Sequence, residues 1–345
     1  MKRLIAIIVN YDKITLFIII YVIINISTVW LFSYTLNNHV KILRAKKIFE
    51  ECDKENYILY LASEFTVDEN DNLYILSSGD QEINKYNHRG EYIKTIGRKG
   101  MGPGEFMNVM HLDIVNDKLI ASSPLRIHYL TLNGKYIDRI DIKPERPWGR
   151  QFINENKYIV LHHSPIRRGA RLKYDENGIF TMLIELVDVK CNKRILIESM
   201  KIYRDDIFVG NKNNSKHLMH SLFFCLCPSN RILFGKTMDF KIYEYINDKK
   251  REIISEPFYK ANEDGNKIQA VACDTNENIY IFVDTKNFKG ISKHTKEGKH
   301  VENYRLVPNP RFFSSQRMIY NNKLYYILYS TDKKLSIWSV ELPTN

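Results

Sequence analysis

The strongest constraint on the fold of this 345-residue chain is a short pattern that occurs six times. In each copy an acidic or amide turn precedes an apolar run, as in DENDNLYI at 68–75 and DTNENIYI at 274–281. The anchor residues of the six runs are Leu73, Leu119, Tyr158, Ile232, Ile279 and Leu324, at intervals of 46, 39, 74, 47 and 45. A repeat of about 40–50 residues made of short strands predicts an all-β, six-bladed β-propeller.

The third interval is longer than the others, and its extra residues fall near 162–190. Two blades would need about 80–90 residues, so six blades are favoured over seven. The extra segment is either an ordinary surface insertion or a binding loop on one face of the ring. The blades are predicted at 63–106, 107–148, 149–216, 217–262, 263–308 and 309–345.

A glycine-rich segment, GRKGMGPGEF at 97–106, follows the first blade's strands. It lacks the GK[ST] ending of a phosphate-binding loop and precedes a strand pattern rather than a helix. We therefore expect it to cross from one blade to the next, with Phe106 packed between them. Hairpin turns are predicted at 87–90, 133–134, 247–248 and 297–298.

The stretch NHRGEYIKTIGRKGMGPGEF at 87–106 resembles the NHL-repeat type of six-bladed propeller. It is most similar to bacterial surface or periplasmic propellers that carry a G-x-G-x-G-P-G-E-F turn. The full motif covers 66–106, and weaker copies cover the rest of 57–345. The resemblance implies the fold and an envelope location, but no particular activity. Many members resemble lipoproteins, whereas this chain lacks a cysteine placed to take a lipid.

An uncharged segment of 19 residues, Ile14 to Phe32, is close to the roughly 20 residues that span a bilayer as a helix. Trp30 and Tyr34 lie where interfacial aromatic residues are common. The alternative is a cleaved signal peptide. The run is longer than a typical signal core, starts after Asp12 and Lys13, and precedes no A-x-A-like site. We therefore predict an uncleaved signal anchor, flanked by the basic residues Lys41, Arg44, Lys46 and Lys47.

Four segments are predicted: a tail at 1–13, a transmembrane anchor at 14–34, a polar connector at 35–56 and the propeller at 57–345. Propellers commonly close by sharing one blade between both chain ends, and the apolar stretch at 57–62 is our candidate for this role. Basic residues on both sides of the span leave its orientation open by charge alone. We expect the propeller to lie outside the cytoplasm, at the cell surface or in the periplasm.

Charge and cysteine content narrow the range of functions. The net charge is +11, but no nucleic-acid recognition motif or long lysine tract occurs, so no nucleic-acid partner is expected. The five cysteines do not have the spacing of a zinc or disulfide framework. Cys225 and Cys227 alternate on a predicted strand, and we interpret both as buried thiols of the core.

A basic patch at the mouth of the ring is the candidate ligand site. We expect it to suit an anionic glycan, a phosphorylated ligand or an acidic partner surface, although dispersed, solvated charge is the plainer interpretation. The candidate ligand-binding residues are Arg98, Arg126, His162, His163, Arg167 and Arg168, with Lys99 and Arg171 beside them.

A divalent metal in the central channel is the cofactor alternative. Lactonase-type and lyase-type propellers resemble one another in holding such a metal with residues from several inner strands. The residues considered are His111, Asp113, His162, His163, His217 and His220, and they do not recur in phase with the blades. No cofactor is therefore expected, and no catalytic residue or metal ligand is assigned.

The sequence thus predicts a membrane-anchored propeller outside the cytoplasm that acts as a non-catalytic binding or scaffold module for a protein or glycan. The alternative is a metal-dependent hydrolase or lyase with its site in the channel. A third hypothesis is a sensor that signals through the span to a partner protein, because only 13 residues precede the span.

Overall fold

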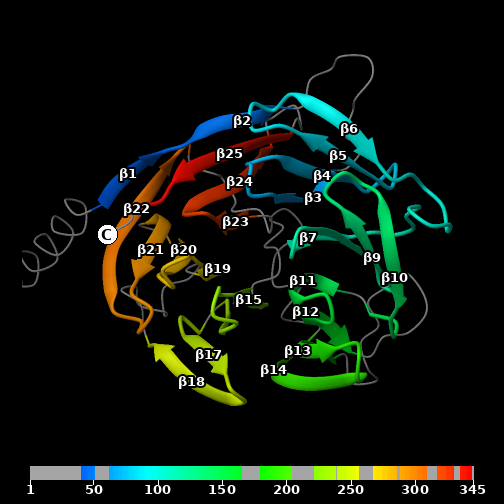
Figure 1. The fold of residues 1–345 in the computed structure, drawn as a ribbon. Helices are drawn as coiled ribbons and strands as arrows, with labels where there is room; N and C mark the ends of the chain where they lie inside the picture. Colours follow the sequence, from blue (N-terminus) through cyan, green and yellow to red (C-terminus); the bar gives the residue numbers. More distant parts are fainter. Residues whose placement is uncertain are drawn as a thin grey trace, which may run out of the picture.

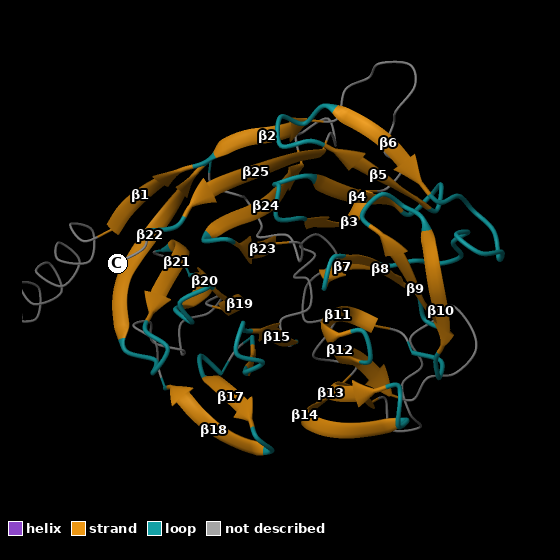
Figure 2. Cartoon of the chain, viewed as in Figure 1, coloured by secondary structure: helices purple, strands orange, loops and turns teal. Residues whose placement is uncertain are grey.

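The computed structural model describes residues 40–50, 62–145, 147–164, 179–203, 221–237, 239–255, 267–285, 288–308, 317–329 and 335–343. These residues form six sheets that stand like blades around a common centre (Figure 1). Figure 2 shows only strands and loops in this part of the chain. The predicted all-β, six-bladed propeller is confirmed. The span predicted at 14–32 lies outside the described residues, among which no helix is long and apolar enough to cross a membrane.

Each blade is a sheet whose first strand lies nearest the centre of the ring (Figure 1). Blade 1 has β3 (Ala62–Val67), β4 (Leu73–Ser77), β5 (Glu82–Tyr86) and β6 (Tyr92–Ile96). Blade 2 has β7 (His111–Val115), β8 (Lys118–Ser122), β9 (Arg126–Thr131) and β10 (Tyr136–Asp141). Blade 3 has β11 (Pro147–Asn154), β12 (Lys157–Ser164), β13 (Ile179–Asp188) and β14 (Lys193–Tyr203).

The second half of the ring contains the remaining three blades. Blade 4 has β15 (Leu222–Leu226), β16 (Ile232–Lys236), β17 (Ile242–Ile246) and β18 (Lys249–Ile254). Blade 5 has β19 (Lys267–Cys273), β20 (Ile279–Asp284), β21 (Lys289–His294) and β22 (His300–Val307), with β1 (Val40–Arg44) outside them. Blade 6 has β23 (Arg317–Tyr320), β24 (Lys323–Tyr329) and β25 (Leu335–Glu341), with β2 (Lys46–Glu50) as its outer strand.

The six anchor residues occupy equivalent places in the blades. Each is the first or second residue of its blade's second strand, and each is at most 2% exposed. The predicted hairpin turns also join the strands expected of them. The long third interval contains a longer β-hairpin, β13 and β14, together with connections at 165–178 and 204–221. The region expected as an insertion at 162–190 is therefore strand at both of its ends.

The acidic residue of the repeat stabilises the turn before the anchor. Asp68 Oδ1 accepts hydrogen bonds from the backbone N–H groups of Asn70 (3.0 Å) and Asn72 (2.9 Å). Its Oδ2 accepts bonds from Asn72 Nδ2 (2.9 Å) and the Tyr74 hydroxyl (3.0 Å). The same four bonds recur in blade 5 around Asp274. The repeated D-x-N-x-N spacing therefore serves the turn, because its buried carboxylate is already hydrogen-bonded at both oxygens.

Residues 40–50 form a strap along the outer edge of the ring (Figure 1). Its first half, β1, pairs in parallel with β22, and its second half, β2, pairs antiparallel with β25. The prediction of a polar connector at 35–56 is thus wrong for the strap. Most of its polar residues are exposed, whereas Phe49 is 7% exposed and packs inward, which suits an outer strand. Blade 6 is indeed shared between early and late parts of the chain, through β2. Of the segment predicted for this role, 57–62, all but Ala62 lies outside the described residues.

A second set of contacts closes the ring near its centre. Lys323 in blade 6 forms an ion pair with Asp71 in blade 1, with 2.5 Å between Nζ and Oδ2. The Tyr325 hydroxyl donates to Asp71 Oδ1 at 2.7 Å. The φ of Asp71 is 59°, in the left-handed region, which is strained for a residue with a side chain. This conformation holds the carboxylate between the two blades.

The connections alternate between two faces of the ring, because neighbouring strands of a blade are antiparallel. One face, which we call the loop face, carries the connections between blades and those between second and third strands. The opposite turn face carries the remaining hairpins. Every connection longer than five residues joins strand ends on the loop face. Long connections often carry function, so this face is the natural place for a site.

The glycine-rich segment crosses between blades 1 and 2 on the loop face, as predicted. Phe106 is fully buried and packs in a cluster with residues of both blades, including Ile96 and Leu130. Gly97 has a φ of +75°, and a Cβ there would lie 2.2 Å from the Phe106 ring. The glycine is thus required both by the backbone and by the ring beside it.

A disulfide joins blades 4 and 5, with Cys227 directly after β15 and Cys273 at the end of β19. The interpretation of Cys227 as a core thiol is therefore wrong, whereas Cys225 is a buried thiol as predicted. Burial raises the pKa of Cys225 to about 12, which keeps it unreactive. The two bonded cysteines are 46 residues apart, about one repeat, so they fall on neighbouring inner strands.

The disulfide predicts a measurable stabilisation. Closing a 46-residue loop contributes about 4 kcal/mol in the chain-entropy model. We expect a Cys227→Ser, Cys273→Ser double variant to lose about 2–4 kcal/mol of unfolding free energy in urea titrations. Cys191→Ser is the control, because this exposed thiol has no disulfide partner. An unchanged midpoint in the double variant would contradict the pairing.

Phe106 predicts a second effect. Replacing Phe106 with alanine should destabilise the chain by about 3–5 kcal/mol, because a fully buried ring leaves a cavity between two blades. Met107→Ala is the neighbouring control, since Met107 is 41% exposed and should cost less than about 0.5 kcal/mol. Thermal and urea unfolding of both variants would show whether the two positions differ in this way.

Candidate functional site

Exposed apolar side chains gather on the loop face from blade 1 to blade 3. We call this set the loop-face patch: Met101, Met107, Met110, Leu125 and Trp148, each 38–55% exposed. Methionine and tryptophan are common at protein interfaces, and methionine adapts to partners of varied shape. Singly exposed apolar residues are ordinary, whereas these five lie on neighbouring segments: the β6–β7 connection, the β8–β9 connection and the start of β11.

Backbone contacts fix the patch to blade 2. The N–H of Met110 donates to Ser122 O at 2.9 Å, and Leu125 O accepts the N–H of Ile142 at 2.8 Å. Arg139 Nη1 donates to Met101 O at 3.2 Å, which ties the glycine-rich crossing to β10. The patch therefore rests on rigid strand ends rather than on a single loop.

Two of the predicted ligand-binding residues border this patch. Arg98 is largely exposed and pairs with Glu105, with 2.8 Å between Nη2 and Oε1. Arg126, the first residue of β9, pairs with Asp141 at 3.2 Å, and Asp141 also lies 3.7 Å from Arg139. The exposed Lys99 and Lys143 add positive charge on the same connections, so basic residues outnumber acidic ones around the patch.

The other predicted residues fall in or after β12. His162 and His163 are buried near the loop-face end of β12, where the His163 ring lies 6.5 Å from the Trp148 ring. Arg167 and Arg168, like Arg171, lie outside the described residues, in the connection between β12 and β13. The structure thus brings His163 next to the patch, whereas His162 turns toward a different partner.

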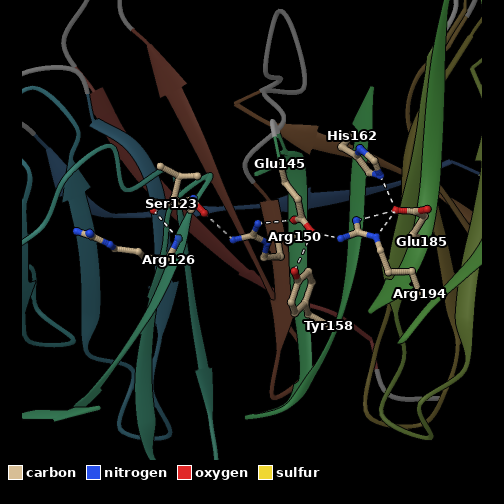
Figure 3. Close-up of polar contacts among 9 residues, drawn as sticks. Ser123, Arg126, Glu145, Arg150, Tyr158, His162, Glu185 and Arg194 are labelled. Atoms are coloured by element: carbon tan, nitrogen blue, oxygen red, sulfur yellow. Dashed lines mark hydrogen bonds and ion pairs between the residues drawn. The ribbon is translucent and has the colours of Figure 1, made fainter. Parts of the chain in front are cut away.

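That partner belongs to a buried charge network between blades 2 and 3 (Figure 3). Glu145, in the connection before β11, is 1% exposed and sits at its centre. Its Oε2 accepts a bond from Arg150 Nη2 (2.6 Å), and its Oε1 accepts bonds from the Tyr158 hydroxyl (2.9 Å) and Arg194 Nη1 (2.6 Å). Arg150 Nη1 donates to Ser123 O at 3.2 Å, which links the network to blade 2.

The network continues across blade 3 to the predicted histidine. Arg194 Nη2 donates to Glu185 Oε2 at 2.7 Å, and His162 Nε2 lies 2.7 Å from the same oxygen. The hydrogen bond with His162, together with Arg194, lowers the pKa of Glu185 to about 2 despite partial burial. Burial alone would raise the pKa of Glu145, but Arg150 and Arg194 outweigh it and hold that pKa below its ordinary value. Both carboxylates are therefore ionised at neutral pH and compensated by arginine.

Polar groups on the inner strands have structural partners as well. His111 Nδ1 lies 3.6 Å from Glu64 Oε2 across blades 1 and 2. Burial raises the pKa of Asp113 to about 7, and its oxygens accept the N–H groups of Phe152 (2.8 Å) and Ile114 (2.8 Å). Among the residues that the structure describes, no three His, Cys, Asp or Glu side chains converge as metal ligands. His217 and His220 lie outside the described residues.

Sequence reasoning missed Glu145 and the loop-face patch. Glu145 is a lone charge in a connection, KPERP at 143–147, and nothing in its spacing marks it as buried. The methionines occur in and just after the glycine-rich segment, whose glycines drew attention to backbone shape instead. Their exposure depends on the fold, in which Phe106 of the same connection is fully buried while the three methionines stay at the surface.

Comparisons with known proteins agree on the fold. Residues 66–145, spanning blades 1 and 2, match a family model (DUF5128) described as a 6-bladed beta-propeller. No curated protein matches the chain. A member of the duf4221 family from Bacteroides vulgatus aligns with a TM-score of 0.54 and 12% identity, over 89% of this chain and 97% of that one.

Two further solved structures are similar. A Bacteroides fragilis protein assigned as exported has a TM-score of 0.51 and 12% identity, over 88% of this chain and 96% of that one. A calcium-binding protein, regucalcin, from Agrobacterium tumefaciens has a TM-score of 0.47 and 10% identity, over 89% and 98%. At such identities the two similarities with TM-scores above 0.5 establish the architecture alone.

The buried network predicts a pH-dependent loss of stability. Glu145→Gln should cost about 3–5 kcal/mol at pH 7, because it leaves buried Arg150 without its counter-charge. Since the pKa of Glu145 is lower folded than unfolded, its contribution is complete above the ordinary value of 4.5 and is lost as the pH falls through the folded pKa. The difference between variant and parent should therefore shrink in acid.

Urea unfolding at pH 7 and at successively lower pH measures this effect. Glu69→Gln is the control, since Glu69 is exposed and should change stability by less than about 0.5 kcal/mol at every pH. A Glu145→Gln loss below about 1 kcal/mol at pH 7 would mean that the network does not stabilise the contact between blades 2 and 3.

Proposed function

We propose that this chain is a membrane-anchored propeller outside the cytoplasm whose loop face binds a protein or glycan partner without catalysing a reaction. The observation that carries the proposal is the loop-face patch, an exposed apolar surface with basic residues around it. Its side chains are of the types enriched at interfaces, and they stand on a rigid closed ring.

The proposed location has support from the cysteines. Disulfides persist in oxidising compartments such as the periplasm and the cell surface, and Cys227–Cys273 joins two blades. The predicted signal anchor at 14–32 would deliver the ring there and keep it at the membrane. A ring of similar fold is assigned as exported in Bacteroides fragilis. We also infer that the blades are of the NHL-like type, which the recurring Asp68 and Asp274 turns support.

Binding is favoured over catalysis by how the polar groups are used. The carboxylates described above have structural roles: Asp113 holds a neighbouring blade's backbone, and Glu145 and Glu185 neutralise arginines. The exposed surface of the loop face is apolar and basic instead. A large apolar side chain such as Trp148 could anchor either a protein or a sugar ring, so both partner classes remain within the proposal.

The patch gives the test. Full-length chain would be incubated with solubilised envelope proteins and with a glycan array, in its parent form and as a Leu125→Ala, Trp148→Ala variant. We expect a partner that the parent retains to bind the variant at least about fivefold more weakly, as for removal of interface anchors worth about 1 kcal/mol or more. Leu196→Ala is the matched control, because Leu196 is 55% exposed but lies on β14, away from the patch.

Retention that is equal in all three forms would contradict binding at the loop face. Elemental analysis of the purified chain is the accompanying measurement. A stoichiometric divalent metal would favour the hydrolase or lyase alternative and direct attention to the channel.

A further inference from the structure

The outer side of the strap carries a second exposed surface, on blades 5 and 6 rather than on the loop face. The parallel register places Ile42 beside Arg305 and Arg44 beside Val307. Ile42 is 57% exposed and Val307 is 37% exposed, and both arginines are exposed as well. We call these four residues together with the exposed Lys46 the strap surface.

The strap surface combines positive charge with apolar side chains. Three of its five residues are basic and none is acidic. The nearest acidic residue on β22, Glu302, pairs with Lys41 at 2.7 Å, and Lys41 alternates with Ile42 and so points to the other side of β1. Arginine and lysine beside exposed aliphatic residues are the composition with which proteins contact anionic lipid headgroups.

The position of the strap in the chain brings this surface to the membrane. The predicted span ends at Phe32, and seven residues separate it from Val40, where β1 begins. A chain of seven residues reaches at most about 25 Å even when fully extended. If the span is the anchor, no part of the described ring is tethered more closely to the bilayer than β1.

We propose that the strap surface lies against the anionic headgroups of the membrane that holds the anchor. The inference rests on the membrane anchor of the proposed function. The ring then stands with the outer edge of blades 5 and 6 on the bilayer, and the loop face stays open to a partner. Each basic side chain near an anionic surface contributes about 1 kcal/mol, or about fivefold in the contact equilibrium.

Photocrosslinking of the full-length chain in lipid nanodiscs tests the contact. A benzophenone amino acid would be introduced at Ile42 or, as the matched control, at Leu196. Leu196 is 55% exposed on the outer strand of blade 3, two blades from β22 (Figure 1). Nanodiscs of phosphatidylcholine alone would be compared with nanodiscs that also contain phosphatidylglycerol, and lipid adducts would be quantified by mass spectrometry.

We expect strong lipid adducts at position 42 and few at position 196, with the position-42 adducts increased by phosphatidylglycerol and reduced by high salt. Arg44→Glu combined with Arg305→Glu should reduce the position-42 adducts at least about tenfold. Lys193→Glu combined with Lys201→Glu makes the same change in net charge on β14 and should leave them unchanged. Thermal unfolding midpoints would confirm that both double variants are folded.

Equal adducts at the two positions, or adducts insensitive to lipid charge and to Arg44 and Arg305, would overturn the strap contact while the anchor stands. Failure of the full-length chain to enter nanodiscs would overturn the anchor itself and the contact with it. Binding of the partner at the loop face is measured separately, so its loss or retention does not bear on this result.

Discussion

The whole molecule depends on closing the ring between blade 6 and blade 1. An open ring would expose two sheet edges and two apolar blade faces. Closure is made at two radii: β2 completes blade 6 at the rim, and Asp71 binds Lys323 and Tyr325 further in. The buried cluster between these blades includes Phe49 from the strap and Leu335 and Ile337 from β25. The ring is closed only when this interface forms.

The blades are held to one another by unlike means. Blades 1 and 2 meet through apolar packing around Phe106, and blades 4 and 5 add a disulfide. Blades 2 and 3 enclose Glu145 and Arg150, whose burial costs free energy that their mutual attraction only partly offsets. A shift of one blade against the other would separate these charges, and an unpaired buried charge is costly. Leu125 and Trp148 of the loop-face patch lie two residues from Ser123 and Arg150, which are hydrogen-bonded across the two blades.

The sequence was sufficient for the architecture because each blade repeats the same physical solution. Buried anchors such as Leu73 and turn-forming residues such as Asp68 recur at a fixed spacing, and a period can be read without coordinates. The candidate site was predictable only in part. The sequence predicts Arg98 and Arg126 as ligand-binding residues, and in the structure each already has an acidic partner.

Other features depend on contacts between distant residues, which no local pattern records. Glu145 is buried because Arg150 and Arg194 reach it from two strands of the next blade. The strap resembles a connector in the sequence because the strands it pairs with lie far along the chain, in β22 and β25. Cys227 and Cys273 were the exception: their separation of one repeat was a readable signal of neighbouring inner strands.

The strap has a consequence for the order of events during synthesis. Phe49 pairs with Ile337, about 290 residues later, so the first strands to emerge from the ribosome must wait for the last ones. Contacts this distant in sequence form slowly, because a long loop must close before they contribute any stability. Until then β1 and β2 lack the strands they pair with and are open to pairing with other chains. The nascent protein therefore passes through a vulnerable interval whose length is set by translation and export, and which ends only when β2 pairs with β25.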